Sequence, residues 1–259
     1  MRPARRRRPR HGRRELMGLV QIAAAGPVIP NYAAQSSSCE VHNRFFCGEW
    51  VSRNWGPVLW PALREHVLLA VVAVAIGFAI SMVLALAAHR YAWLERPTIL
   101  VTTILYTIPA LALFELLAAP VGLNVYSAEI ALVSYTLLIL VRNILAGLRA
   151  VPAEVLDAAE GAGMSRRQTL VRVELPLALP AIIAGLRIAI VTIIALATIV
   201  YVVYDRGLGV PIHTALGEGP FKTELIVAGG LAIGLALVAD GLLVLVQRLL
   251  TPWTRARAG

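Results

Sequence analysis

The chain reads VLLAVVAVAIGFAISMVLALAA from Val67 to Ala88, without a single charged side chain. A helix rises about 1.5 Å per residue, so a bilayer core about 30 Å thick needs roughly 20 apolar residues in a row. This stretch meets that length. It therefore predicts a helix that crosses a membrane.

Four further apolar stretches follow on its C-terminal side, and we expect spans at about residues 67–88, 99–119, 130–148, 180–204 and 225–246. The whole chain of 259 residues is 58% hydrophobic and 15% charged, with a mean hydropathy of +0.74. Soluble domains carry about 25% charged residues, so this composition excludes a soluble protein as the main interpretation. Lipid-facing backbone must satisfy its own hydrogen bonds. The predicted fold is therefore all-α and membrane-spanning, with five spans over residues 65–250, or six if a short N-terminal segment also crosses.

Orientation follows the arginines in the short connections, because cytoplasmic loops carry an excess of Lys and Arg. Arginines occur after the first predicted span (Arg90, Arg96), after the third (Arg149, Arg166, Arg167, Arg172) and in the tail 251–259 (Arg255, Arg257). The segment Pro120–Glu129 has neither Lys nor Arg. These three basic connections are therefore predicted to be cytoplasmic, and residues 39–64 to lie outside the cell.

The net charge of +9 comes almost entirely from eight arginines within the first 14 residues. Such a terminal run is a targeting or surface feature more often than a nucleic-acid site. Residues 1–38 then have three interpretations: a cleaved signal, a short sixth anchor at Leu16–Pro30, or an extension ahead of a true start at Met17. We favour the third, because the arginines then need no structural role.

The two cysteines, Cys39 and Cys47, both fall in the predicted external segment. Thiols outside the cytoplasm can form a disulfide that closes a short loop. Two free thiols in a mobile segment are the alternative. A metal site has little support, because only His42 lies nearby as a further ligand.

The predicted cytoplasmic loop 149–178 contains VPAEVLDAAEGAGMSRRQ, residues 151–168. Pro152 suits a first helical turn, and Glu154 and Asp157 favour the positive end of the helix dipole. Gly161 and Gly163 are expected to stop the helix, after which Ser165 and Gln168 form a capping box for a second one. Leu175-Pro176 is expected to end that second helix. A partner could approach the first helix closely at Ala158 and Ala159, although a helix resting on lipid headgroups fits the same pattern.

Asp157-Ala158-Ala159, Gly163, Val173 and Leu175-Pro176 resemble the EAA loop of bacterial ABC importer permeases, in which EAA, three residues, G, nine residues, I, one residue and LP follow in order. Asp replaces Glu and Val replaces Ile, and both changes keep charge or shape. In that family the loop is a coupling helix that docks into a cleft of an ATPase subunit. The resemblance implies the type I importer fold, in which two permease subunits, two ATPases and an extracytoplasmic binding protein form the transporter in a bacterial cell membrane.

From about Cys39 to Trp253 the chain is also similar to the glycine betaine, carnitine and choline permeases. The similarity lies in Tyr106–Ala112, Leu140–Pro152, Val173–Pro180 and Gln247–Trp253. It implies import of a quaternary ammonium osmoprotectant, with an amino acid or a sulfonate as the competing substrate. Tyr204-Asp205-Arg206 departs from the small residues that this group often has there.

A quaternary ammonium ion has no N–H to donate and is best held by aromatic faces. The aromatic candidates for the translocation path are Tyr106, Tyr135, Tyr201 and Tyr204, and Pro109 lies beside the first of them. Tyrosines near span ends are also common interfacial anchors. Placing a charged side chain inside a membrane is energetically costly. We therefore expect Arg187 and Asp240 to pair with each other rather than to bind substrate.

We expect no catalytic residue, no metal and no cofactor in this chain. It has no G-x-x-x-x-G-K-[ST] run, so ATP and Mg²⁺ are expected on the partner ATPase. An ion-driven secondary transporter is the first rival, but it usually has inverted repeats, and no convincing repeat is evident here. A membrane-bound enzyme is the second rival, and it lacks a cluster of His, Cys or carboxylate side chains in or near the spans.

Overall fold

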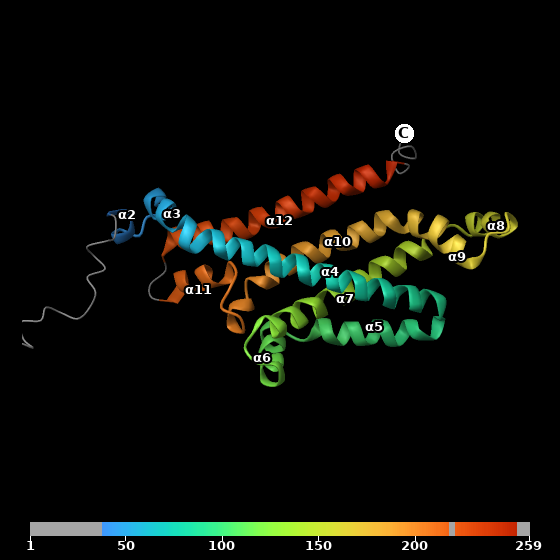
Figure 1. The fold of residues 1–259 in the computed structure, drawn as a ribbon, viewed down its shortest axis with the longest axis horizontal. Coiled ribbons are helices and arrows are strands. Elements are labelled where there is room, and N and C mark those ends of the chain that lie inside the picture. Colours follow the sequence, from blue (N-terminus) through green and yellow to red (C-terminus); the bar gives the residue numbers. More distant parts are fainter. Residues whose placement is uncertain (1–37, 218–220, 253–259) are drawn as a thin grey trace, which may run out of the picture. The chain divides into compact units, whose positions relative to one another are not determined.

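The computed structural model describes residues 38–217 and 221–252, whose regular structure is helical throughout (Figure 1). The chain divides into two units, Met1–His42 and Asn43–Gly259. The first unit contributes one described helix, α2 (Ser38–Val41). Residues 1–37 of the predicted N-terminal extension, and Arg255 and Arg257 of the predicted tail, lie outside the described residues.

The second unit contains the membrane helices. Its elements are α3 (Gly48–Asn54), the π-turn η2 (Trp55–Leu59), α4 (Trp60–Arg90), α5 (Ala92–Thr107), α6 (Ala110–Val121), α7 (Val125–Arg149), α8 (Ala153–Gly161), α9 (Arg166–Thr169), the π-turn η3 (Leu170–Glu174), α10 (Leu175–Ala197), the 3₁₀ turn η4 (Val200–Val202), α11 (Gly209–Gly217) and α12 (Lys222–Leu250).

Four continuous helical stretches are long and apolar enough to cross a membrane, namely Gly48–Arg90, Val125–Arg149, Arg166–Ala197 and Lys222–Leu250. A fifth crossing is formed by α5 and α6 together, if this bent pair counts as one span. The predicted all-α membrane fold is therefore confirmed. The helices extend beyond the predicted spans, because hydropathy marks the part of a helix that suits lipid and not the residues at which its hydrogen bonds begin and end.

The second predicted span, 99–119, is wrong as a single straight helix. Between α5 and α6 the axis bends by 97°. Ile108 has an extended ψ angle of 128°, because the ring of Pro109 disfavours the α conformation of the residue before it. Pro109 itself also has an extended ψ, of 135°. The hydroxyl of Tyr135 donates a hydrogen bond to the Ile108 carbonyl. This carbonyl lies at the break, outside the hydrogen-bond pattern of the helix.

Two predicted boundaries of the fourth span are also wrong. Residues 198–204 do not continue the helix, since α10 ends at Ala197 and the chain passes through η4. At the other end of this span, Leu175-Pro176 does not end the preceding helix as predicted. The π-turn η3 leads directly into α10, with the Leu175 N–H bonded to the Leu170 carbonyl. Its wider turn and the position of Pro176 in the first turn of α10 avoid the clash that proline causes in a helix interior.

The centre of this unit is α7, which packs against both α4 and α10 (Figure 1). These helices approach closely where one of them has a glycine. A side chain at Gly77 of α4 would overlap Thr136 of α7, and a Cβ at Gly147 of α7 would lie 2.9 Å from the Ala178 carbonyl oxygen of α10. Two apolar clusters fill the interior, one around Leu132 and Ile193 and the other around Leu140 and Ile144.

The last helix, α12, is packed least. Its neighbours are mainly α10 and α11, and almost none of its apolar stretch is buried within the chain. Its exposed apolar side chains are Ile226, Ile233, Leu237, Val238, Leu242, Leu245, Val246, Leu249 and Leu250. In a membrane this surface faces lipid or another subunit.

Candidate functional site

The loop between α7 and α10 forms two short helices that project from one end of the bundle, which we call the loop end (Figure 1). Pro152 is the N-cap of α8, and Glu154 lies in its first turn. Gly163 then adopts a left-handed conformation with φ of 73°. The Gly163 N–H bonds to the Glu160 carbonyl at 2.8 Å and the Met164 N–H to the Ala159 carbonyl at 3.1 Å, which is a Schellman motif.

The second helix of the loop begins as predicted. Ser165 accepts a hydrogen bond from the Gln168 N–H, and the Gln168 side chain accepts one from the Ser165 N–H at 2.7 Å. The predicted capping box is therefore confirmed. Of the two glycines expected to stop α8, Gly161 is still helical and Gly163 makes the turn.

The outward face of α8 is small and acidic. Glu154, Asp157 and Ala158 are exposed, and their spacing of three and four residues places them side by side on the helix. Ala159 is buried on the inner face, with only 6% of its surface exposed. Farther along the motif Val173, Leu175 and Pro176 are half-buried, so they anchor the loop rather than present it. A groove on a partner protein could therefore approach the backbone of α8 closely.

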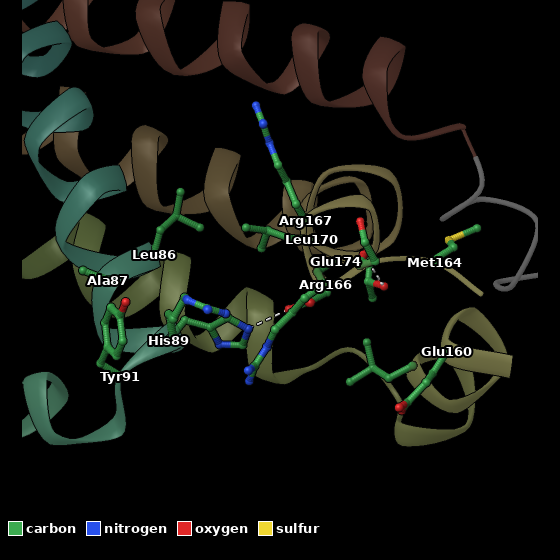
Figure 2. Close-up of a pocket in the computed structure, with 14 residues that line it drawn as sticks. Leu86, Ala87, His89, Tyr91, Glu160, Met164, Arg166, Arg167, Leu170 and Glu174 are labelled. Atoms are coloured by element: carbon green, nitrogen blue, oxygen red, sulfur yellow. Dashed lines mark hydrogen bonds and ion pairs between the residues drawn. The ribbon is translucent and has the colours of Figure 1, made fainter. Parts of the chain in front are cut away.

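A pocket of about 1130 Å³ lies between this loop and the end of α4 (Figure 2). Leu86, Ala87 and Tyr91 line it from the bundle, while Leu156 and Met164 line it from the loop. The His89 Nε2 and Glu174 Oε2 atoms are 2.6 Å apart at its wall. Figure 2 shows the His89 ring pointing toward Glu174 and Arg166 extending beside them.

The start of the same loop is held by an ion pair. Arg149, the last residue of α7, contacts Glu95 in the first turn of α5. His89 and Glu95 flank the turn at Tyr91 that joins α4 to α5. We call residues 89–95 the α4–α5 corner. These contacts could not be predicted from the sequence, because the partners are 54 and 85 residues apart.

The tyrosines predicted to line the translocation path do not all lie together in the structure. Tyr106 and Tyr135 form an edge-to-face ring contact, with centroids 5.9 Å apart, next to the break that begins α6 at Pro109. Tyr201 stacks instead on His213 at 4.3 Å, and Tyr204 packs against the cluster around Leu132. Within the described ranges, Tyr106 and Tyr135 are the predicted tyrosines that make a ring contact with each other.

The two intramembrane charges lie together. Arg187 of α10 donates two hydrogen bonds to Asp240 of α12, at 2.7 Å and 2.9 Å to the two carboxylate oxygens. This geometry satisfies both carboxylate oxygens with one planar guanidinium group. The two predicted external cysteines, Cys39 and Cys47, are both disulfide-bonded.

One buried polar residue escaped the sequence interpretation. His66 of α4 is fully buried, and its Nε2–H donates to the Ile194 carbonyl at 3.0 Å while its Nδ1 accepts from the Leu208 N–H at 3.3 Å. Because His66 follows Arg64 and Glu65, it looks in the sequence like a residue at the membrane interface. The only sign of its buried role in the sequence is its position just ahead of the apolar run.

Comparison with known proteins gives one consistent result. Residues 77–255 match the family described as the binding-protein-dependent transport system inner membrane component. The osmoprotectant import permease protein OsmW of Salmonella typhimurium strain LT2 is 35% identical over 194 residues, which cover 73% of this chain and 89% of that protein. The glycine betaine/carnitine/choline transport system permease protein OpuCD of Bacillus subtilis strain 168 is 34% identical over 206 residues, 79% of this chain and 89% of that protein.

Among solved structures, a chain of the MetNI methionine ABC transporter in an inward-facing conformation superposes with a TM-score of 0.68. The match covers 76% of this chain and 99% of that one at 20% sequence identity. At this identity the likeness concerns the fold alone.

Proposed function

Since the chain belongs to the binding-protein-dependent transport system inner membrane components, a family of ABC importer permeases, we propose that it imports quaternary ammonium osmoprotectants of the glycine betaine, choline and carnitine class. The observation that carries the substrate is the similarity, over most of both chains, to permeases named for these solutes. The loop end then faces the cytoplasm. ATP and Mg²⁺ bind to an ATPase subunit, and a binding protein delivers the solute outside.

The exposed face of α8 supports the contact with the ATPase. Its small residue Ala158 allows close approach, and the charges of Glu154 and Asp157 surround it. Helices commonly dock in a partner's groove in this way. When nucleotide binding closes the ATPase pair, α8 is displaced sideways and the spans tilt, so that access changes from one side of the membrane to the other.

The tyrosines support a weak route for a cation. Tyr106 is exposed beside the break in the second span at Pro109, and the buried ring of Tyr135 packs edge-to-face against it. Aromatic faces attract a quaternary ammonium ion without hydrogen bonds. A second permease subunit, identical or related, completes the path, and tight selectivity resides in the binding protein.

The direct test is uptake by the complete system. Cells that lack other osmoprotectant importers would express this chain with its ATPase and binding protein, and uptake of labelled glycine betaine, choline and carnitine would be measured. We expect uptake that stops when the ATPase is inactivated, and an ATPase that co-purifies with the chain. Uptake of an amino acid or a sulfonate alone would refute the substrate class. Uptake that depends on an ion gradient and not on ATP would refute the importer.

The first variant to test is Gly163→Val. A β-branched residue at φ of 73° costs at least about 1–2 kcal/mol, although nothing lies within 4 Å of the added atom. The turn after α8 should therefore change shape, and uptake should be lost while membrane insertion stays normal. Gly161→Ala is the matched control, because Gly161 is helical and also has open space around it. Undiminished uptake by Gly163→Val would contradict docking through α8.

A further inference from the structure

One ion pair and one side-chain hydrogen bond join the loop between α7 and α10 to the α4–α5 corner. Arg149 contacts Glu95, and His89 contacts Glu174 at 2.6 Å. Arg149 and Glu174 are the residues immediately before and after the loop segment 150–173. Both ends of the moving segment are thus fastened to one short stretch of chain.

In the described part of the chain, no ion pair joins residues 150–173 to this corner, and Leu170 of the loop packs against the apolar cluster that includes Ala85 and Ala88 of α4. The pocket of about 1130 Å³ separates Leu156 and Met164 of the loop from Leu86 and Tyr91 at the end of α4 (Figure 2). A displacement of α8 cannot reach α4 by direct packing across such a space. It reaches α7 and α10 through the peptide chain itself, because the loop is continuous with both.

The helices α4 and α5 have no such covalent link to the loop. Near the loop end they contact the loop and its flanking helices through the Glu95–Arg149 ion pair, the His89–Glu174 hydrogen bond and the apolar cluster that contains Ala85 and Ala88 of α4. Apolar packing holds the helices together but is non-directional, so it specifies their relative position less sharply than a polar contact does. An ion pair or a side-chain hydrogen bond is directional and fixes the position of the corner against the loop.

We propose that Glu95, Arg149, His89 and Glu174 are positioning residues that transmit the displacement of the loop to the first two spans. The inference rests on the proposed function, because it requires an ATPase that moves α8. With the pairs intact, α4 and α5 follow α7 and α10 during each cycle. With a pair broken, α7 and α10 still respond to the ATPase, while the α4–α5 hairpin lags and the path opens incompletely.

If either contact is broken, we expect ATP hydrolysis to continue while less solute is transported per ATP. The reconstituted transporter, with its ATPase and binding protein, would be placed in liposomes. The measured quantity is the number of ATP molecules hydrolysed per labelled glycine betaine imported. Coupling energies of exposed ion pairs correspond to about two- to fivefold changes in an equilibrium, so Glu95→Arg and Arg149→Glu should each raise this ratio by about that factor.

The double variant Glu95→Arg/Arg149→Glu restores opposite charges and should return the ratio toward that of the unaltered chain. Glu174→Gln and His89→Gln test the second pair while keeping side-chain size. Glu174 is the stricter test, since Arg166 also lines the pocket and could replace His89 as its partner. If Glu95→Arg does not insert, the nearly isosteric Glu95→Gln serves in its place.

Glu49→Gln is the matched control. It removes an exposed Glu–Arg pair within α3, far along the sequence from the corner, and should leave the ratio unchanged. Single variants that keep the normal ratio, or a double variant no better than either single one, would overturn the inference. If instead the unaltered chain neither binds an ATPase nor imports with ATP, the proposed function itself fails.

Discussion

At the scale of single residues, His66 shows how one side chain can connect three segments. Its ring lies in α4, its Nε2–H donates to the carbonyl of Ile194 near the end of α10, and its Nδ1 accepts from Leu208. The Ile194 carbonyl is among the last of its helix and would otherwise lack a partner. Leu208 follows Gly207, whose φ of 83° turns the chain toward the ring.

The substitution His66→Ala should lower stability measurably. It leaves a buried N–H and a buried carbonyl without partners, which costs about 1–3 kcal/mol for each group that stays unsatisfied. The measurement is the midpoint of thermal unfolding of the purified protein in detergent. His213→Ala is the control, because His213 is exposed and contacts only the ring of Tyr201 among the ring contacts found here. Equal midpoints for the two variants would show that the bridge contributes nothing.

Most of the residue-scale features that could be predicted from the sequence have local partners. The capping box at Ser165 and the turn at Gly163 depend on residues within five positions, and both were predicted correctly. The pair Glu95–Arg149 and the bridge made by His66 join residues 54 to 142 positions apart. The pair Arg187–Asp240, 53 positions apart, could be predicted because two opposite charges within apolar spans each need a partner. For the other distant contacts the sequence offers no such constraint.

At the scale of elements, α10 and α12 are joined by apolar packing around Ala236 and Ala239 and by one polar contact. The helix α12 buries little of its apolar stretch, and Arg187 and Asp240 join it to α10 by two hydrogen bonds. An unpaired charge within the membrane is costly, whereas an apolar replacement of both partners is tolerated.

The single variants Arg187→Leu and Asp240→Leu should therefore each reduce the amount of folded protein, and the double variant should recover most of it. The yield of monodisperse protein after detergent extraction measures this. Uptake by the double variant should then occur with unchanged apparent affinity, since the pair is structural. A double variant that folds but no longer imports would place Asp240 in the substrate path.

The existence of the spans could be predicted from apolar length, because the bilayer imposes that length directly. Their ends and breaks could not. Pro109 was visible within the second apolar run, yet proline is tolerated in many membrane helices when neighbours satisfy the freed groups. At this break the freed Ile108 carbonyl accepts a hydrogen bond from the Tyr135 hydroxyl of another helix, and the local sequence could not predict that partner.

At the scale of the whole molecule, the structure makes a definite topological prediction. If the loop end is cytoplasmic, α4 and α7 both run inward and α10 runs outward. The connection Gly122–Asn124 and the turn before α11 then lie outside, and the C-terminus lies inside. The absence of Lys and Arg between residues 120 and 129 agrees with this orientation.

Reporter fusions test this directly. A fluorescent protein fused at Arg257 should fold and fluoresce, because it does so in the cytoplasm. Alkaline phosphatase fused after Leu123 should be active, because it requires the exterior. The reverse pattern would show that the protein has the opposite orientation in the membrane. The helix α8 would then lie outside the cell, where it could not contact a cytoplasmic ATPase.

The break between α5 and α6 has a consequence for how the protein is made. The two arms have 16 and 12 residues, so they are about 24 Å and 18 Å long, and neither alone matches a hydrocarbon layer of about 30 Å. The insertion machinery must therefore accept them together as one segment. The Tyr135 hydroxyl that holds Ile108 belongs to α7, which is synthesised later. The contact that holds the bend from outside the pair can therefore form only after α7 has been synthesised, so the two arms enter the bilayer before their support exists.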